Sequence, residues 1–282
     1  MDYFPDSQLI SGFFNAGQQE LLDAIYQELD AKARMIVQQA QAENCTLADF
    51  YRRQQTLIVV PEKQSTDRIC RMEYLNGSSE TFYQQVTLPV QRRLEELVGA
   101  KLTLFKDKCN VKAPQGGAFP PHQDAPAYRN FGPTIFITAG IMLDTLSTDN
   151  GCLHMAANYR KLNTGIVQNC TTPYGGYPLF KYFVGGERNG DLLDEVQTLL
   201  QWETINAQAG DILVFNSFIP HFSHINTSQQ YRRVFYLTFN LLSEGSHYNH
   251  YYKKKWQDYS NPQFHISTPT THAALPICRG LL

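Results

Sequence analysis

The sequence lacks strong net charge, paired cysteine motifs and long apolar runs, and each absence excludes a class of protein. Its 24 Lys and Arg nearly balance 26 Asp and Glu, which gives a net charge of −2 and no electrostatic footprint for nucleic acid or an anionic membrane. The six cysteines form no C-x-x-C pair, which argues against a zinc site and a disulfide scaffold. The longest apolar run, residues 134–143, is too short to cross a bilayer, and the first thirty residues do not have the pattern of a signal peptide. We therefore expect a soluble, cytoplasmic protein.

Helical patterns fill the first third of the chain, and strand patterns fill most of the remainder. Residues 17–44 carry leucine and isoleucine at close to helical spacing, and residues 80–98 form a second helical stretch, broken or kinked near Pro89. From Lys101 onward, apolar and aromatic runs bounded by turn residues indicate strands. This order predicts a mainly β fold with flanking helices, a double-stranded β-helix of the jelly-roll or cupin type.

The length and apolar content suit a single domain. With 282 residues, of which 43% are apolar, the chain can bury one large core. The predicted parts of this domain, residues 1–282, are a helical N-terminal part over about 1–100, a barrel over about 101–245 and a C-terminal extension over about 246–282.

A possible metal site begins at His122-Gln123-Asp124. Side chains two residues apart on an extended strand share a face, so His122 and Asp124 can converge on one ion while Gln123 points away. A distant second histidine, His221, would complete the two-histidine, one-carboxylate triad that holds ferrous iron and leaves positions open for substrates. His224 is an alternative third ligand, but it lies three residues further on and faces the other side of a strand.

A possible anion site follows that histidine. Tyr231-Arg232-Arg233 begins a new apolar, aromatic strand, and a buried arginine entering a barrel needs an anion. Its planar guanidinium matches a carboxylate bidentately, which suits the far carboxylate of 2-oxoglutarate. Neighbours on a strand face opposite ways, so either Arg232 or Arg233 faces the cavity and the other is a surface residue.

These segments together resemble the phytanoyl-CoA dioxygenase family of iron(II)/2-oxoglutarate oxygenases. The resemblance rests on Ser11-Gly12-Phe13, Pro121-His122-Gln123-Asp124, Leu143-Asp144 with Asn150-Gly151-Cys152-Leu153, and His221-x-Ser223-x-x-Asn226 with Arg232. It implies that His122, Asp124 and His221 bind Fe(II), and that Arg232 and Ser223 bind 2-oxoglutarate.

The same resemblance implies the reaction. Oxygen and 2-oxoglutarate would be converted to succinate, carbon dioxide and an oxidant that hydroxylates a substrate carbon. Relatives that halogenate lack the carboxylate ligand, and this chain keeps Asp124. The sequence departs from the family at residues 155–159, where Met-Ala-Ala-Asn-Tyr replaces a common Pro-Gly-Ser-His turn.

The substrate is a small molecule, and its candidate contacts lie beside the metal motif. Lys108, Asn110 and Lys112 share one face of a strand, so their donors would reach an anionic substrate or, for Asn110, the keto-acid end of 2-oxoglutarate; an outward orientation of the lysines is the alternative. Gln123 and Tyr128 are further candidates for the pocket rim. Within the family, this stretch is most similar to bacterial hydroxylases of small phosphonates, and an amine-like substrate is a variant of the same hypothesis.

Two other functional hypotheses also fit the sequence. One is a tailoring oxygenase acting on an alkaloid or amino-acid-derived scaffold. The other is a barrel that binds a metal or small ligand without turnover, although a mere binding module does not need the complete set of ligands and arginine. We expect a monomer or homodimer without nucleic-acid or membrane partners.

Two further segments have their own expectations. Residues 169–191 are rich in Gly, Tyr and Pro, which is typical of a lid or binding loop. The tail from residue 247 packs over the site mouth or at an oligomer interface, and the run at residues 253–255 is expected to be a solvated basic face. The tail histidines are expected at the surface rather than at a metal: His247, His250, His265 and His272.

Overall fold

The computed structural model describes residues 6–62, 68–162, 167–168 and 177–261. Their main element is a seven-stranded sheet, with a four-stranded and a two-stranded sheet beside it. The large sheet has the order β1 (Ser7–Ile10), β11 (Ile212–Asn216), β6 (Phe136–Met142), β13 (Arg232–Leu241), β4 (Leu102–Lys112), β3 (Ile69–Glu73) and β2 (Ile58–Pro61). The small sheet has the order β10 (Trp202–Thr204), β7 (Leu153–Ala156), β12 (His221–Ser223) and β5 (Phe119–His122), and β8 (Val167–Gln168) pairs with β9 (Leu179–Phe180).

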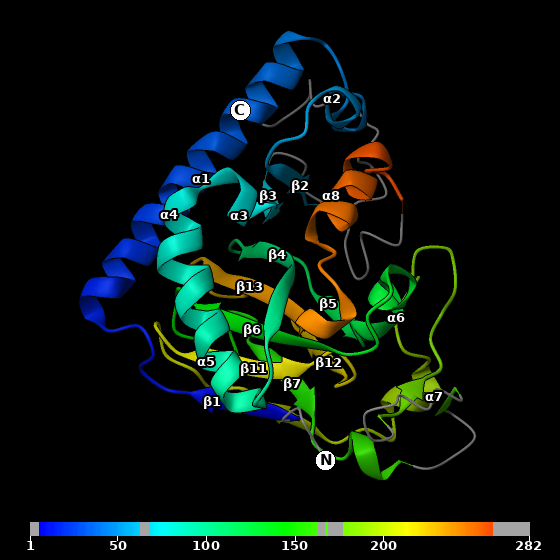
Figure 1. Ribbon diagram of the computed structural model, residues 1–282. Helices are drawn as coiled ribbons and strands as arrows, with labels where there is room; N and C mark the ends of the chain where they lie inside the picture. Colours follow the sequence, from blue (N-terminus) through cyan, green and yellow to red (C-terminus); the bar gives the residue numbers. More distant parts are fainter. Residues whose placement is uncertain (1–5, 63–67, 163–166, 169–176, 262–282) are drawn as a thin grey trace.

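Helices lie around the large sheet (Figure 1): α1 and α5 run along its left in this view, whereas α8 lies elsewhere and carries Tyr251 of the pocket described below. The chain enters α1 through a capping box, in which the Asn15 side chain accepts from the Gln18 backbone and Gln18 bonds back. The helices are α1 (Ala16–Ala42), α2 (Leu47–Arg53), α3 (Leu75–Ser78), α4 (Glu80–Phe82), α5 (Leu88–Val98), α6 (Ala125–Tyr128), α7 (Asp194–Gln197) and α8 (Tyr248–Gln257), with a π-helical turn η1 (Tyr83–Thr87) and 3-10 turns η2 (Arg129–Phe131), η3 (Tyr159–Lys161) and η4 (Leu242–Glu244).

The local predictions hold for most elements of the described chain. The helix expected over 17–44 is α1, and the break near Pro89 is real: the π-helical turn η1 interrupts the regular α-helix directly before Pro89, and there the Leu88 N–H donates to the Tyr83 carbonyl five residues back. Mainly antiparallel sheet with flanking helices confirms the predicted fold class. One apolar core joins α1, both larger sheets and α8, while the single-domain organisation of the whole chain stays a prediction.

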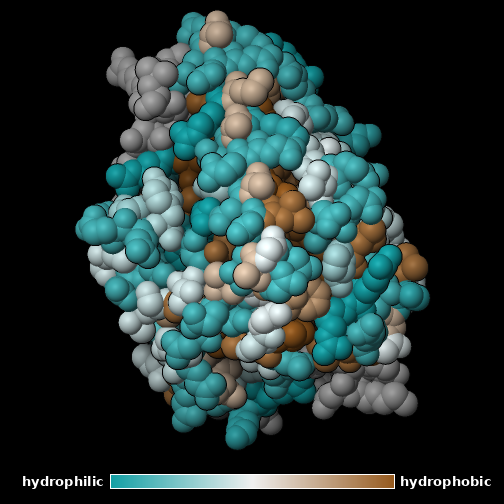
Figure 2. Space-filling model, turned by 90° about the vertical axis from the view of Figure 1, so that its left-hand side faces the viewer, coloured by the Kyte–Doolittle hydropathy of each residue, from teal (hydrophilic) through white to brown (hydrophobic). Residues whose placement is uncertain are grey.

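The face seen in Figure 2 is the left-hand side of Figure 1, where α1 lies. Hydrophilic residues dominate this face, and apolar residues appear in small, broken groups. The buried residues of α1, among them Leu22, Ile25 and Leu29, follow the helical period, so the helix turns its polar side outward. Within the described ranges, no helix is long and apolar enough to cross a membrane.

The expectation for the basic run in α8 is wrong at one position. Lys253 and Lys254 are exposed, but Lys255 is fully buried and its Nζ donates to Glu73 Oε1 at 2.6 Å. A buried ammonium group needs such a partner, and the sequence near the lysine run does not contain it. His247 and His250 lie outside the metal cluster described below, whereas His265 and His272 lie outside the described residues.

Candidate metal and anion site

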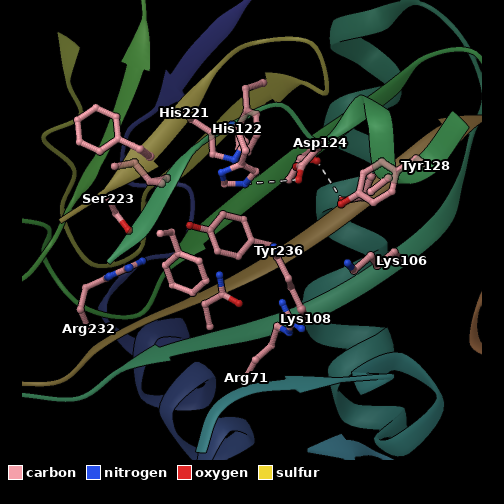
Figure 3. A pocket seen from close by; sticks show the side chains of 18 of the residues that line it. Arg71, Lys106, Lys108, His122, Asp124, Tyr128, His221, Ser223, Arg232 and Tyr236 are labelled. Atoms are coloured by element: carbon pink, nitrogen blue, oxygen red, sulfur yellow. Dashed lines mark hydrogen bonds and ion pairs between the residues drawn. The ribbon is translucent and has the colours of Figure 1, made fainter. Parts of the chain in front are cut away.

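A pocket lies between the inner faces of the two larger sheets (Figure 3). The large sheet supplies lining residues from β4, β13 and β6, and the small sheet supplies them from β5 and β12. Three groups of polar side chains line it: the His122–Asp124–His221 cluster, the pair Ser223 and Arg232, and a group of basic residues.

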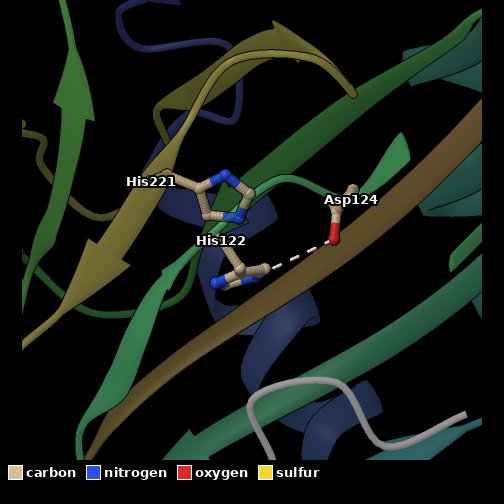
Figure 4. Close-up of side chains that lie close together, drawn as sticks. All are labelled: His122, Asp124 and His221. Carbon is tan, nitrogen blue, oxygen red and sulfur yellow. Dashed lines mark ion pairs between the residues drawn. The ribbon is translucent and has the colours of Figure 1, made fainter. Parts of the chain in front are cut away.

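The three predicted metal ligands meet at one point of this pocket (Figure 4). His122, Asp124 and His221 are all buried, and one potential ligand atom from each lies within 4.8 Å of the others. His122 Nε2 lies 3.9 Å from Asp124 Oδ1, and the two imidazole ring centroids are 4.3 Å apart. Among the described residues, this is the one group of three or more His, Cys, Asp or Glu side chains with such spacing.

The backbone explains why these residues converge. His221 of β12 pairs directly with His122 of β5, so two residues far apart in sequence face each other across one strand pair. Asp124 is not on the strand, contrary to the expectation from the i, i+2 spacing: β5 ends at His122, and Asp124 has helical φ and ψ of −75° and −30° at the start of α6. The bend, rather than strand alternation, aims its carboxylate at the histidines.

Gln123 anchors this bend and is not part of the pocket lining, which corrects its assignment as a rim residue. Its side chain is fully buried, donates to the carbonyls of Pro178 and Phe218, and accepts from the backbone N–H of Phe180. These bonds join β9 and the loop before β12 to the metal motif. Pro178 and Phe180 of the predicted lid therefore pack against the motif, while residues 169–176 lie outside the described chain.

Hydrogen bonds set both histidines up as metal ligands. The Nδ1 atoms of His122 and His221 lie 2.7 Å and 3.0 Å from the carbonyl oxygens of Pro120 and Ile219, so each Nδ1–H donates there and each Nε2 keeps its lone pair. Burial, reinforced by His221, lowers the pKa of His122 to about 3, and burial also lowers the pKa of His221. Burial alone would raise the pKa of Asp124, but His221 and Lys108 outweigh it and lower the pKa. Two neutral imidazoles and one carboxylate result, which is the donor set that suits Fe(II).

The alternative ligand His224 is excluded by its position. It is exposed, and its ring packs against His154 and Phe222 at centroid distances of 5.1 Å and 5.0 Å. Strand alternation in β12 turns His221 inward, and the chain beyond Ser223 leaves the sheet.

Arg232 and Arg233 point in opposite directions from the start of β13. Arg232 lines the pocket, is 1% exposed, and its Nε and Nη1 have no hydrogen-bond partner in the described chain. Arg233 binds Asp144 through two hydrogen bonds of 2.9 Å and 2.6 Å and lies 2.8 Å from Asp23. A buried guanidinium with unpaired donors fits a carboxylate ligand, so Arg232 is the anion-binding candidate of the two.

Other predicted residues surround Arg232. Ser223 lines the pocket, and its hydroxyl accepts from Lys112 Nζ at 2.8 Å. Asn110 also lines the pocket, and its buried Oδ1 has no hydrogen-bond partner among the described residues. Lys112 shares the strand face but does not line the pocket, because it turns to Ser223 and the carbonyl of His224.

The basic group includes one predicted residue and two that sequence reasoning missed. Lys108 lines the pocket as expected, and so does Tyr128; Lys106 and Arg71 join them. Lys106 lies two residues before Lys108 and therefore on the same face of β4, which runs without a break through both residues. Arg71 has no local signal, because its place beside β4 depends on the pairing of β3.

Solved structures share this fold. Over 85% of this chain and 73% of the other, the structure of EctD from S. alaskensis with 2-oxoglutarate and 5-hydroxyectoine superposes with a TM-score of 0.56 at 16% identity. The epimerase SnoN, in complex with Fe3+, alpha ketoglutarate and nogalamycin RO, gives a TM-score of 0.55 at 16% identity over 83% of this chain and 78% of its own. These likenesses bear out the predicted jelly-roll fold.

Sequence relatives and the family match extend the likeness. The chain is 35% identical over 162 residues to the 2-aminoethylphosphonate dioxygenase of Uncultured bacterium HF130_AEPn_1, covering 57% of this chain and 55% of that protein. It is 35% identical over 167 residues to the methylphosphonate hydroxylase of Gimesia maris, covering 58% and 55%. The matched regions span about half the length of these curated relatives. Residues 10–234 match the description Phytanoyl-CoA dioxygenase (PhyH), and the chain belongs to this phytanoyl-CoA dioxygenase family.

Proposed function

We propose that the protein is an Fe(II)- and 2-oxoglutarate-dependent dioxygenase that hydroxylates an aliphatic C–H bond of a small phosphonate. The observation that carries the proposal is the convergence of His122, Asp124 and His221 in a buried pocket that also holds the guanidinium of Arg232, whose Nε and Nη1 have no hydrogen-bond partner among the described residues. A binding module without turnover has no need for both features together.

Each polar residue of the site has a role in this proposal. His122, Asp124 and His221 hold Fe(II) on one face. Arg232 and the Ser223 hydroxyl bind the far carboxylate of 2-oxoglutarate, and the Nδ2 amide of Asn110, another pocket-lining residue, donates to its keto-acid end. Iron, when bound, would let 2-oxoglutarate reduce O2, so that one oxygen atom would go to the substrate C–H bond and the other to succinate, with carbon dioxide as the second co-product.

The substrate class is proposed from two kinds of support. The relatives named above are called a 2-aminoethylphosphonate dioxygenase and a methylphosphonate hydroxylase. The pocket carries Arg71, Lys106 and Lys108 in addition to Arg232, which favours an anion over a neutral alkaloid scaffold.

We further propose that the protein works in the cytoplasm as a monomer or homodimer, and that its partner is a small molecule alone. Size-exclusion chromatography with light scattering tests the oligomeric state.

The test is a turnover assay with purified protein loaded with Fe(II) under anaerobic conditions. After oxygen is added, succinate formation is measured with and without methylphosphonate, and products are screened by mass spectrometry for a gain of one oxygen atom. We expect phosphonate to accelerate 2-oxoglutarate consumption and to gain one oxygen. Loaded protein that never consumes 2-oxoglutarate contradicts the oxygenase proposal and favours a binding barrel. Oxidation of cyclic or amino-acid-derived metabolites, with phosphonates inert, favours a tailoring oxygenase instead.

A further inference from the structure

The inner face of β4 carries two lysines whose ammonium groups have no hydrogen-bonding partner in the described part of the chain. Within the described ranges, neither Lys106 Nζ nor Lys108 Nζ makes a hydrogen bond or ion pair. Lys106 Nζ lies 5.4 Å from the ring centroids of both Tyr128 and Tyr251, and Lys108 Nζ lies 5.1 Å from that of Tyr236. Lys106 is 6% exposed, and Lys108, a pocket-lining residue, is partly exposed toward the cavity. Such poorly solvated ammonium groups are costly unless an anion joins them.

A buried carboxylate near these lysines, that of Glu73, already forms ion pairs with Arg71 and Lys255. Glu73 Oε1 lies 2.7 Å from Arg71 Nε and 2.6 Å from Lys255 Nζ, and all three side chains are buried. Burial opposes ionisation of Glu73, but Lys255, Lys106 and Arg71 together lower its pKa, so it is a carboxylate. Glu73 therefore balances one positive charge, while the wall formed by Arg71, Lys106 and Lys108 keeps an excess.

This basic wall is separate from the Arg232 site. In the pairing of β13 with β4, Arg232 lies opposite Lys112, whereas Tyr236 lies opposite Lys108 and Thr238 lies opposite Lys106. At about 3.3 Å per residue, Lys108 is about 13 Å along the strand from the level of Arg232, and Lys106 is about 20 Å away. Figure 3 shows the same separation, with Arg232 and Ser223 on one side and Arg71, Lys106 and Lys108 on the other. One 2-oxoglutarate molecule held by Arg232 and the metal leaves the basic wall free for another anion.

Negative charge is scarce around the basic wall. Asp124 is the one carboxylate among the described lining residues, and it belongs to the metal cluster. The tyrosine rings that would attract a cation already face Lys106 and Lys108.

We propose that Arg71, Lys106 and Lys108 form a head-group subsite for a phosphonate dianion, and that this subsite selects against substrates that carry an ammonium group. The inference rests on the proposed function and deepens it by separating two kinds of phosphonate. A dianion matches the surplus charge of the wall. An ammonium group in the same pocket loses its water, meets like charges and finds no free carboxylate.

The test compares three ligands of nearly equal size by isothermal titration calorimetry. Propylphosphonate is the reference, propane-1-sulfonate carries one charge less, and 2-aminoethylphosphonate replaces the terminal methyl group by ammonium. The full chain is loaded with Fe(II) and 2-oxoglutarate under argon, so that binding is measured without turnover. Lys106→Met and Lys108→Met remove one charge each at similar side-chain length, and Lys253→Met, on the exposed side of α8, is the matched control.

The proposal expects propylphosphonate to bind at least about tenfold more tightly than either other ligand, and each pocket variant to weaken its binding by about 10- to 100-fold. Lys253→Met should change the affinity by less than about twofold. Both pocket variants should fold, because methionine removes a poorly solvated charge and keeps the apolar stem.

Three results overturn the inference or part of it. Equal affinities for phosphonate and sulfonate, or unchanged affinity in both pocket variants, contradict the dianion subsite. Binding of 2-aminoethylphosphonate as tight as that of propylphosphonate contradicts the selection against ammonium. The two proposals can be rejected separately. If the ligands bind as expected but the protein never consumes 2-oxoglutarate, the subsite is upheld and the hydroxylase is rejected. If a phosphonate is oxidised but its affinity is unchanged in both pocket variants, the hydroxylase is upheld and the subsite is rejected.

Discussion

Lys255 in α8 and Glu73 in β3 form a fully buried ion pair, with Nζ and Oε1 2.6 Å apart. The pair ties the C-terminal helix to the strand that also carries Arg71. Through this contact α8 places Tyr251 in the pocket wall, so the expectation that the tail packs near the site is confirmed for α8. The folded position of the tail and the charge of the pocket therefore depend on the same carboxylate.

Removal of the Glu73 charge should cost more stability than removal of Lys255. Glu73→Gln leaves Arg71 and Lys255 buried without their counter-charge, and we expect a loss of about 3–5 kcal/mol in the free energy of unfolding. Lys255→Met should cost less, because Arg71 still pairs with Glu73. Urea unfolding followed by circular dichroism measures both. The ion pair of Lys101 and Glu95 at the surface provides the control, and Lys101→Met should lower the free energy of unfolding by less than about 1 kcal/mol. If Glu73→Gln costs no more than Lys101→Met, the buried-pair argument is contradicted.

Metal retention should distinguish the two histidines of the β12 segment. His221→Ala removes a ligand from the buried cluster, so we expect bound iron to fall well below one equivalent per chain after desalting. His122→Ala should also abolish turnover. His224→Ala alters an exposed ring outside the cluster and should leave iron content unchanged. Elemental analysis of the anaerobically loaded proteins checks this. Loss of iron in His224→Ala together with retention of iron in His221→Ala would assign the ligand to His224.

The adjacent arginines should separate co-substrate binding from stability. Arg232→Met removes the buried guanidinium of the pocket, and we expect the KM for 2-oxoglutarate to rise by about 100-fold, the size of a lost charge-assisted contact. Arg233→Met breaks the outer contacts to Asp144 and Asp23, so it should lower the melting temperature and change this KM by less than about twofold. Steady-state succinate assays and thermal unfolding measure the two effects. Equal KM values for both variants would remove Arg232 from the co-substrate site.

Lys108 should give the ligand-free protein a stability that increases in alkaline solution. Burial, assisted by Lys106, lowers the pKa of Lys108 to about 8, below the unfolded value of about 10.4. Between these pH values the unfolded chain binds the proton and the folded chain does not, so the free energy of unfolding increases with pH, by at most about 1.4 kcal/mol per unit. Below about pH 8 the penalty is constant.

The measurement is the difference in unfolding free energy between wild type and Lys108→Met at several pH values. The variant should be the more stable protein at pH 7, and its advantage should shrink between about pH 8 and 10.4. A difference that does not vary with pH would show that the ammonium group is well solvated in the folded state.

The sequence was enough to predict the cluster of two histidines and one aspartate because its signals are local, whereas the choice of Arg232 over Arg233 came from the family resemblance. His122, Asp124 and His221 lie in short motifs, and strand parity separates Arg232 from Arg233 once the start of β13 is known. The same local reasoning predicted α1, the break near Pro89 and the mainly β fold. It placed Asp124 in the cluster for a wrong geometric reason, because spacing does not reveal that the strand ends at His122.

Tertiary structure alone decided which charged groups are buried and what they face. Lys255 belongs to a basic run that looks solvated, and its burial depends on Glu73, 182 residues away. Gln123 was expected at the pocket rim, but contacts with Pro178, Phe180 and Phe218 turn it into the core. The free energy of a buried polar or charged side chain is set by the partner that packing brings to it, and that partner is not encoded in the neighbouring sequence. For this reason the motifs predicted the members of the buried cluster, while only the assembled sheets placed Arg71 and Lys106 in the pocket wall.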